Sequence, residues 1–80
     1  MAHGFTNIID TDYAIQLDEA ANGITYVGKA VPGSATSSAV WQIKKIDESG
    51  TGGIELVILW ADGNKNYDNI FDDRTTLNYS

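Results

Sequence analysis

Residues 60–68, which read WADGNKNYD, carry side-chain oxygens at alternate positions. Oxygen ligands at this spacing are typical of a calcium-binding loop, and Asp73 falls at the twelfth position of that motif. The motif also needs glycine at its sixth position, where this chain has Tyr67, and a helix before it, where residues 54–60 have strand character. The candidate ligands are Asp62, Asn64, Asn66, Asp68 and Asp73.

A turn accounts for the same residues more simply. Asp, Gly and Asn tolerate a positive φ and bond to their own backbone. The sequence therefore predicts that Asp62, Gly63 and Asn64 turn the chain as it leaves an apolar strand. A calcium site of irregular geometry that uses Asp68, Asp72 and Asp73 is a weaker alternative. The sequence therefore predicts no cofactor.

Residues 23–30, GITYVGKA, nearly match a phosphate-binding loop, G-x-x-x-x-G-K-[ST]. Ala30 replaces the hydroxyl that would bind Mg²⁺, and the interior ITYV is β-branched and aromatic. Pro32 and Gly33 follow where the motif needs a helix. The stretch is therefore predicted to be a strand.

Catalytic groups are sparse. The chain has one histidine, His3, and no cysteine, so the serines lack a base near them in sequence. Carboxylates occur in neighbouring pairs, such as Asp72 with Asp73, and we expect these to be solvated or paired with Arg74. The sequence predicts that the protein is not an enzyme.

The 80 residues carry a formal net charge of −6, with 5 basic and 11 acidic residues. Nucleic-acid binding needs a basic surface, so it is not expected. No apolar run reaches the roughly 20 residues of a membrane span. Residues 1–10 lack the features of a secretory signal, which favours synthesis in the cytoplasm. We expect one domain over residues 1–80, with residues 1–10 as a flexible arm.

Apolar and polar residues alternate with period two through most of the chain, which indicates strands. In the first strand, Tyr13, Ile15 and Leu17 alternate with smaller or polar residues, as in a half-buried strand. Asn22-Gly23 predicts a hairpin with a type I′ turn, and Pro32-Gly33 predicts a type II turn. The predicted strands are residues 13–18, 24–31, 39–46 and 54–61.

The C-terminal part is predicted to contain one helical turn and a short last strand. Tyr67, Ile70 and Phe71 have the i, i+3, i+4 spacing of a helix, which Asn66 could cap. Residues 75–80 complete the pattern as a strand. The fold class is therefore all-β, a single small antiparallel sandwich or barrel of about five strands.

The run from Leu56 to Ala61 is apolar at every position, so both faces of that strand need cover. A chain this small has little core, and a second copy can supply the missing cover. We therefore expect a homo-oligomer. The residues expected in the core or the interface are Trp41, Leu56, Ile58, Trp60 and Phe71.

Several stretches also resemble a family. Residues 26–48 (YVGKAVPGSATSSAVWQIKKIDE) and 58–74 (ILWADGNKNYDNIFDDR), with the closing LNYS, resemble short uncharacterised proteins of tailed bacteriophages and marine metagenomes. The genes of these proteins often lie near virion-structural genes. The resemblance covers roughly residues 12–80 and carries no catalytic residues. It implies a small β protein that is a virion component.

Three functions follow as hypotheses. The first is a self-associating, non-enzymatic structural or interaction domain of a virion, in contact with its own copies and with other virion proteins. The second is a binding module for a host-surface glycan or a virion protein, using Trp41 or Trp60 and assisted by Ca²⁺. The third is a small phage protein that binds a host cytosolic protein.

Overall fold

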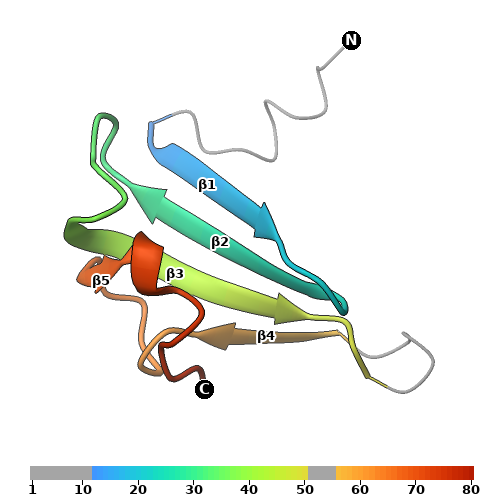
Figure 1. Ribbon diagram of the computed structural model, residues 1–80. Helices are drawn as coiled ribbons and strands as arrows, with labels where there is room; N and C mark the ends of the chain where they lie inside the picture. The colour runs from blue at the N-terminus through green and yellow to red at the C-terminus, as the bar shows by residue number, and fades with distance from the viewer. Residues whose placement is uncertain (1–11, 51–55) are drawn as a thin grey trace, which may run out of the picture.

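The computed structural model describes residues 12–50 and 56–80, and these form one antiparallel sheet (Figure 1). Neighbouring strands follow the order β1-β2-β3-β4, and β5 pairs with β3 beyond the end of β4. A single 3-10 turn, η2, follows β5 directly. The elements are β1 (Ala14–Glu19), β2 (Ile24–Ala30), β3 (Ala39–Asp47), β4 (Val57–Trp60), β5 (Asn69–Ile70) and η2 (Phe71–Asp73).

The predicted fold class is confirmed: the described residues contain five antiparallel strands and one helical turn near the C-terminus. The sheet is not closed, so it is not a barrel. The reason lies in β3, the longest strand, which β2 accompanies on one side. The short strands β4 and β5 divide its other side between them, and none of the described strands pairs with both β4 and β1.

The predicted turns are present at the predicted residues. Asn22 and Gly23 have φ values of 65° and 77°, as a type I′ turn requires. The last β1–β2 pair is Glu19 with Thr25, so this connection is longer than a two-residue hairpin loop. Gly33 has a φ of 90°, and the amide of Ser34 donates to the carbonyl of Val31, closing the second turn.

The C-terminal elements differ from the sequence prediction. The helical turn begins at Phe71, and Ile70, which precedes it, makes no side-chain capping bond. Asn66 is therefore not its cap. Residues 75–80 form no strand; they contribute an isolated bridge between Tyr79 and Ala61, and Ser80 exchanges backbone hydrogen bonds with Trp60. The fourth strand is shorter than residues 54–61, since it begins at Val57; residues 54 and 55 lie outside the described residues.

One face of the sheet carries the core. Trp41 and Ile43 on β3 are each 1% exposed, and the C-terminal segment places Phe71 over them. The rings of Trp41 and Phe71 lie 5.6 Å apart between centroids, in a tilted arrangement. The indole Nε1 of Trp41 donates to the carbonyl of Ala35 at 2.9 Å, so the buried ring leaves no polar atom without a partner.

Gly28 in the middle of β2 makes room for this packing. A Cβ at position 28 would lie 2.5 Å from Cδ1 of Phe71 and 3.1 Å from the Trp41 ring. The glycine is not in a positive-φ conformation, so steric room accounts for it better than backbone freedom does. Glycine in a strand interior commonly marks such a close approach.

We predict that Gly28→Ala destabilises the fold, although alanine is normally favoured over glycine in a strand. Because the Phe71 ring is held against Trp41, the added methyl group should lower the free energy of unfolding by about 1–3 kcal/mol. Urea denaturation measures the change. In a double-mutant cycle, Phe71→Leu should cost less in the Gly28→Ala background than alone; strictly additive costs would contradict the contact.

Candidate functional site

The two faces of the sheet differ in what covers them. Directly paired residues point to the same side of a sheet and alternate along each strand. The face with Gly28, Trp41 and Ile43 is the covered face, because the segment from Phe71 to Tyr79 packs on it. In Figure 1 η2 lies in front of β3, so the opposite face, here called the open face, is turned away from the viewer.

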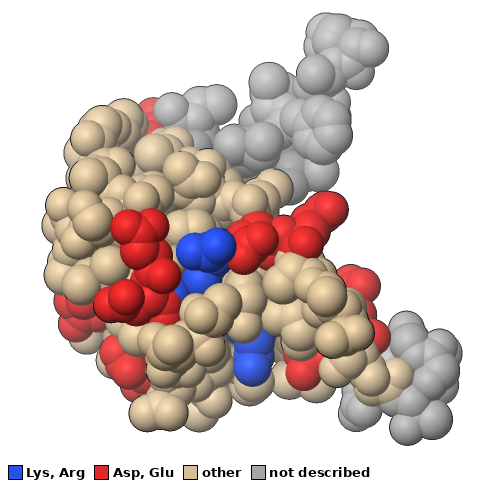
Figure 2. Space-filling model, in the orientation of Figure 1, with Lys and Arg blue, Asp and Glu red and all other residues tan. Residues whose placement is uncertain are grey.

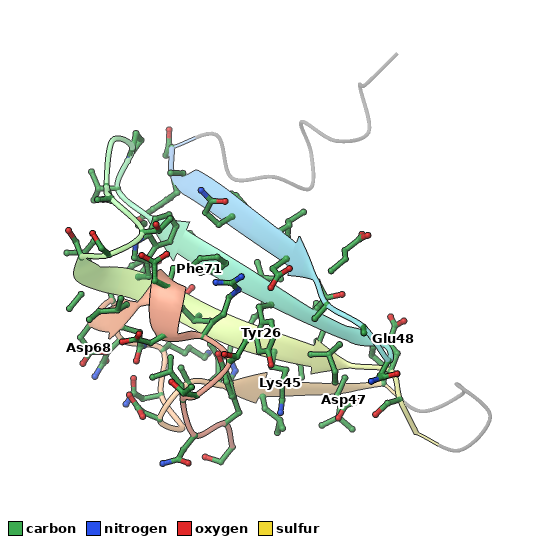
Figure 3. All side chains as sticks on the ribbon, in the orientation of Figure 1. Tyr26, Lys45, Asp47, Glu48, Asp68 and Phe71 are labelled. Atoms are coloured by element: carbon green, nitrogen blue, oxygen red, sulfur yellow. The ribbon has the colours of Figure 1, made fainter. Side chains whose placement is uncertain are left out.

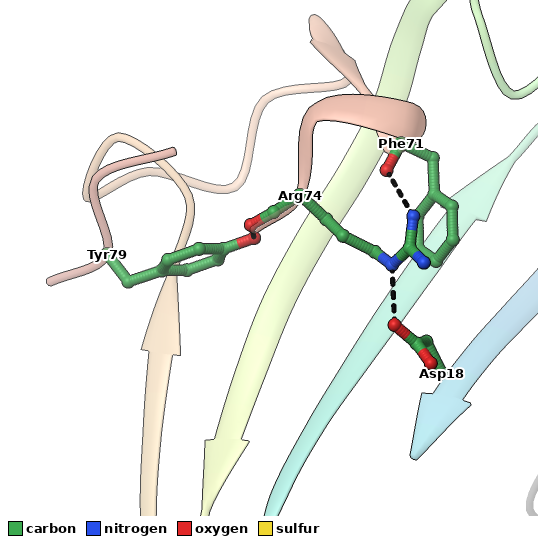
Figure 4. Close-up of polar contacts among 4 residues, drawn as sticks. All are labelled: Asp18, Phe71, Arg74 and Tyr79. Atoms are coloured by element: carbon green, nitrogen blue, oxygen red, sulfur yellow. Dashed lines mark hydrogen bonds and ion pairs between the residues drawn. The ribbon is translucent and has the colours of Figure 1, made fainter. Parts of the chain in front are cut away.

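Polar contacts fasten the C-terminal segment to the covered face (Figure 4). The Nε of Arg74 lies 2.7 Å from Oδ2 of Asp18 on β1, and its Nη1 donates to the carbonyl of Phe71. The hydroxyl of Tyr79 donates to the carbonyl of Arg74 at 2.8 Å. Of the two expectations for Asp72 and Asp73, pairing with Arg74 is wrong, because Arg74 bonds to Asp18 across the sheet. Both aspartates are exposed, as expected of solvated carboxylates.

Aromatic and basic side chains continue this contact toward the other end of the sheet. Tyr26 and Lys45 are directly paired on β2 and β3 (Figure 3). Both reach the ring of Tyr79. The Lys45 Nζ lies 5.1 Å from that ring centroid. Acidic side chains lie on both sides of the basic ones on this face of the molecule (Figure 2). The covered face is thus closed by aromatic packing and edged with negative charge.

The open face presents apolar side chains from all four long strands. Leu17 on β1 pairs with Val27 on β2, and Ile46 on β3 pairs with Ile58 on β4. Leu17 is 60% exposed and Ile58 is 48% exposed. Trp60 lies on the same face, beside Lys44. These apolar residues form what we name the open-face band: Leu17, Val27, Ile46, Ile58 and Trp60.

This arrangement reverses the expectation for the first strand. The apolar residues Ile15 and Leu17 lie on the open face, while Ala14 packs against the core. The small residue is needed there because the covered face already holds two large aromatic rings. The apolar alternation was recognised correctly, but it lines a face that no other part of the described chain covers completely.

The segment 61–68 crosses one end of the open face. The side-chain amide of Gln42 donates to the carbonyl of Lys65 at 2.9 Å, and the Lys65 Nζ lies 5.7 Å from the Trp60 ring centroid. Tyr67 stacks on Tyr13 with ring centroids 5.9 Å apart. A shallow, mainly apolar hollow lies at this end, lined by Tyr13, Val31, Val40 and Tyr67.

The oxygen-rich residues of this segment form a turn. Asp62 and Gly63 have φ values of 58° and 71°, and the amide of Asn64 bonds to the carbonyl of Ala61. The side-chain oxygen of Asn64 accepts the amide of Asn66 at 2.9 Å. One candidate calcium ligand, the side-chain oxygen of Asn64, is thus hydrogen-bonded within the turn.

The other candidate ligands do not complete a site. Asp68 is exposed before β5, and Asp73 belongs to η2. Within residues 12–50 and 56–80, no three His, Asp or Glu side chains gather in a way that could hold a metal ion.

The predicted core or interface residues divide into two groups. Trp41 and Phe71 are core residues, and Trp41 is too buried to bind a glycan. Leu56 and Ile58 are exposed, and Trp60 is half-buried beneath two lysines.

The near match to a phosphate-binding loop forms a strand, as the sequence predicted. Residues 24–30 of the match form β2, with their amides in a sheet between two neighbouring strands. His3 lies outside the described residues.

Comparison with known proteins yields no relative: no protein-family model, curated protein or solved structure matches this chain. The part of the chain that the structure describes contains no helix with the length and apolar character needed to cross a membrane.

The sequence reading missed two contacts that hold the C-terminal segment on the covered face. The unexplained Gly28 in a strand was a signal for one of them, whereas nothing in the sequence pairs Asp18 with Arg74.

Tyr79 generates a prediction for alkaline pH. Burial raises its pKa above the ordinary value near 10, and the nearby Tyr26 adds to the rise. Above pH 10 the unfolded chain loses this proton while the folded chain keeps it, so stability should fall as pH rises. Tyr79→Phe should lower stability at neutral pH by about 1 kcal/mol through the lost hydrogen bond, but flatten the fall above pH 10.

Urea denaturation across a pH series measures both effects. The matched control is Tyr67→Phe at an exposed tyrosine, which should keep the wild-type slope. An unchanged slope in Tyr79→Phe would show that this phenol does not contribute to the alkaline loss.

Proposed function

We propose that this protein is a non-enzymatic structural domain that associates with copies of itself, as a component of a tailed-phage virion. The observation that carries the proposal is the open-face band, in which Leu17 and Ile58 are exposed and the apolar side chains of the two strands between them are half-buried. Contiguous exposed apolar surface in a small protein marks an interaction site. The resemblance to phage proteins supports the virion assignment.

The size of the core supports the same proposal. The described residues contain five buried hydrophobic side chains, two of which are alanines: Ala30, Trp41, Ile43, Ala61 and Phe71. The chain also has no cysteine, so disulfides cannot add stability. Small domains of this kind commonly gain their remaining stability from association. Burial of the open-face band would provide it, because each fully buried aliphatic side chain contributes about 1.5–3 kcal/mol.

We expect the purified protein to form a defined oligomer at micromolar concentration, and its melting temperature to rise with protein concentration, since association stabilises only the folded state. Multi-angle light scattering measures the mass, and melts at several concentrations test the linkage. A well-folded monomer with a concentration-independent melting temperature would overturn the proposal.

For the virion assignment, mass spectrometry should find the chain in purified particles of its phage; its absence would favour the host-protein hypothesis instead.

A second candidate function, a binding module, is favoured by the hollow beside the stacked Tyr13 and Tyr67 rings. Exposed aromatic rings can stack on the apolar face of a sugar ring. Trp41 no longer belongs to this hypothesis, since it is 1% exposed. We expect Tyr67→Ala to abolish a signal on a glycan array, with Trp41→Phe as a control that keeps the core filled. An array without signal for the wild-type protein would remove this candidate.

A further inference from the structure

We propose that a second copy of this chain docks face to face on the open face, with Lys44 of each copy near Glu19 of the other. This inference rests on the proposed function, because it names the surface and the charges through which the protein would self-associate. The partner is a second copy because the open face carries apolar side chains and both signs of charge, and so can complement itself.

The apolar part of the surface is continuous across the sheet. Two neighbouring rows run from strand to strand, one with Leu17, Val27, Lys44 and Trp60, and the next with Glu19, Thr25, Ile46 and Ile58. Five of these eight side chains are apolar and make up the open-face band. A band this wide can meet an identical band on a second sheet, as in a β-sandwich.

The charges in these rows are opposite in sign and lie on different strands. Lys44 is on β3, half-buried, with its Nζ 5.5 Å from the Trp60 ring centroid. Glu19 is exposed at the end of β1. In a twofold interface every contact occurs twice, so one Lys44–Glu19 pairing gives two attractions. A face with one sign of charge would repel its own copy instead.

The covered face and the outer edge of β4 are less suited to docking than the open face. The covered face is already occupied by the segment from Phe71 to Tyr79, which packs on Trp41 and Ile43, so its central apolar residues are not available to a second copy. The outer edge of β4 is already paired at Trp60, because Trp60 and Ser80 exchange two backbone hydrogen bonds of 3.0 Å. Face-to-face docking leaves the acidic surfaces outward, where the net charge of −6 keeps the dimer soluble.

The first test uses two neighbours on β4 that point to opposite faces. Ile58 is 48% exposed on the open face, and Val57 is 39% exposed on the other side. Ile58→Lys should raise the dissociation constant at least about tenfold, a loss of about 1.4 kcal/mol, whereas Val57→Lys should leave it nearly unchanged. Leu17→Lys, at the most exposed apolar residue of the band, repeats the test if Ile58→Lys does not fold.

Sedimentation equilibrium measures the constants, and circular dichroism confirms folding of each variant. A wild-type protein that is monomeric overturns both this inference and the proposed function. A wild-type oligomer that folded Ile58→Lys or Leu17→Lys leaves intact overturns only the choice of surface.

The second test exchanges the charges. Glu19→Lys alone and Lys44→Glu alone each place like charges opposite one another, so each variant should associate at least about tenfold more weakly than wild type. An equimolar mixture of the two variants restores opposite charges at both contacts of a mixed dimer. We expect the mixture to associate more tightly than either variant alone, with the mixed dimer identified by native mass spectrometry.

The double variant Glu19→Lys/Lys44→Glu should also recover association, since two copies of it again place opposite charges at both contacts between the chains. Equal association of the wild type and both single variants would overturn the assigned charge pairing, as would weak single variants that fail to recover on mixing. Recovery should diminish in 1 M salt, because screening weakens the contact between charges.

Discussion

The Phe71 ring against Gly28 and Trp41 is the contact on which the rest of the structure depends. It fixes the C-terminal segment on one face of the sheet, and from there Arg74 reaches Asp18 and Tyr79 reaches back to Arg74. The contact requires both a bulky ring and a strand residue without a side chain. Within residues 12–50 and 56–80, no comparable segment packs over the middle of the other face.

The two faces of the sheet therefore have different physical character. The covered face holds the buried aromatic residues and carries acidic groups at its edges. The open face is apolar in its middle, with Lys44 and Glu19 as opposite charges on separate strands. Unequal faces of this kind suit a protein that completes its fold by association, since the water-exposed apolar band is a cost to a monomer and a gain to an assembly.

The sequence predicted most of what depends on local geometry. Asn22-Gly23 and Asp62-Gly63 adopt the positive φ values expected of them, because those conformations are available to few residue types. The extent of β3 and the burial of Trp41 also followed from period-two alternation. The helical turn was misplaced by several residues, since β5 pairs with β3 and takes Ile70 out of the helix. Pairing between distant segments overrode a short spacing pattern.

By itself, the amino-acid sequence determined the fold class, the turns and the shortage of core, since these depend on alternation, backbone preference and length. Only the tertiary structure decided which face of the sheet is buried. Both faces of β1 and β4 include residues that a core could accept, and the choice came from where the C-terminal segment packs. For the segment that reads WADGNKNYD the sequence already favoured a turn over a calcium site, and the folded chain adds that Asn64 bonds to Asn66 and that the segment turns toward Tyr13.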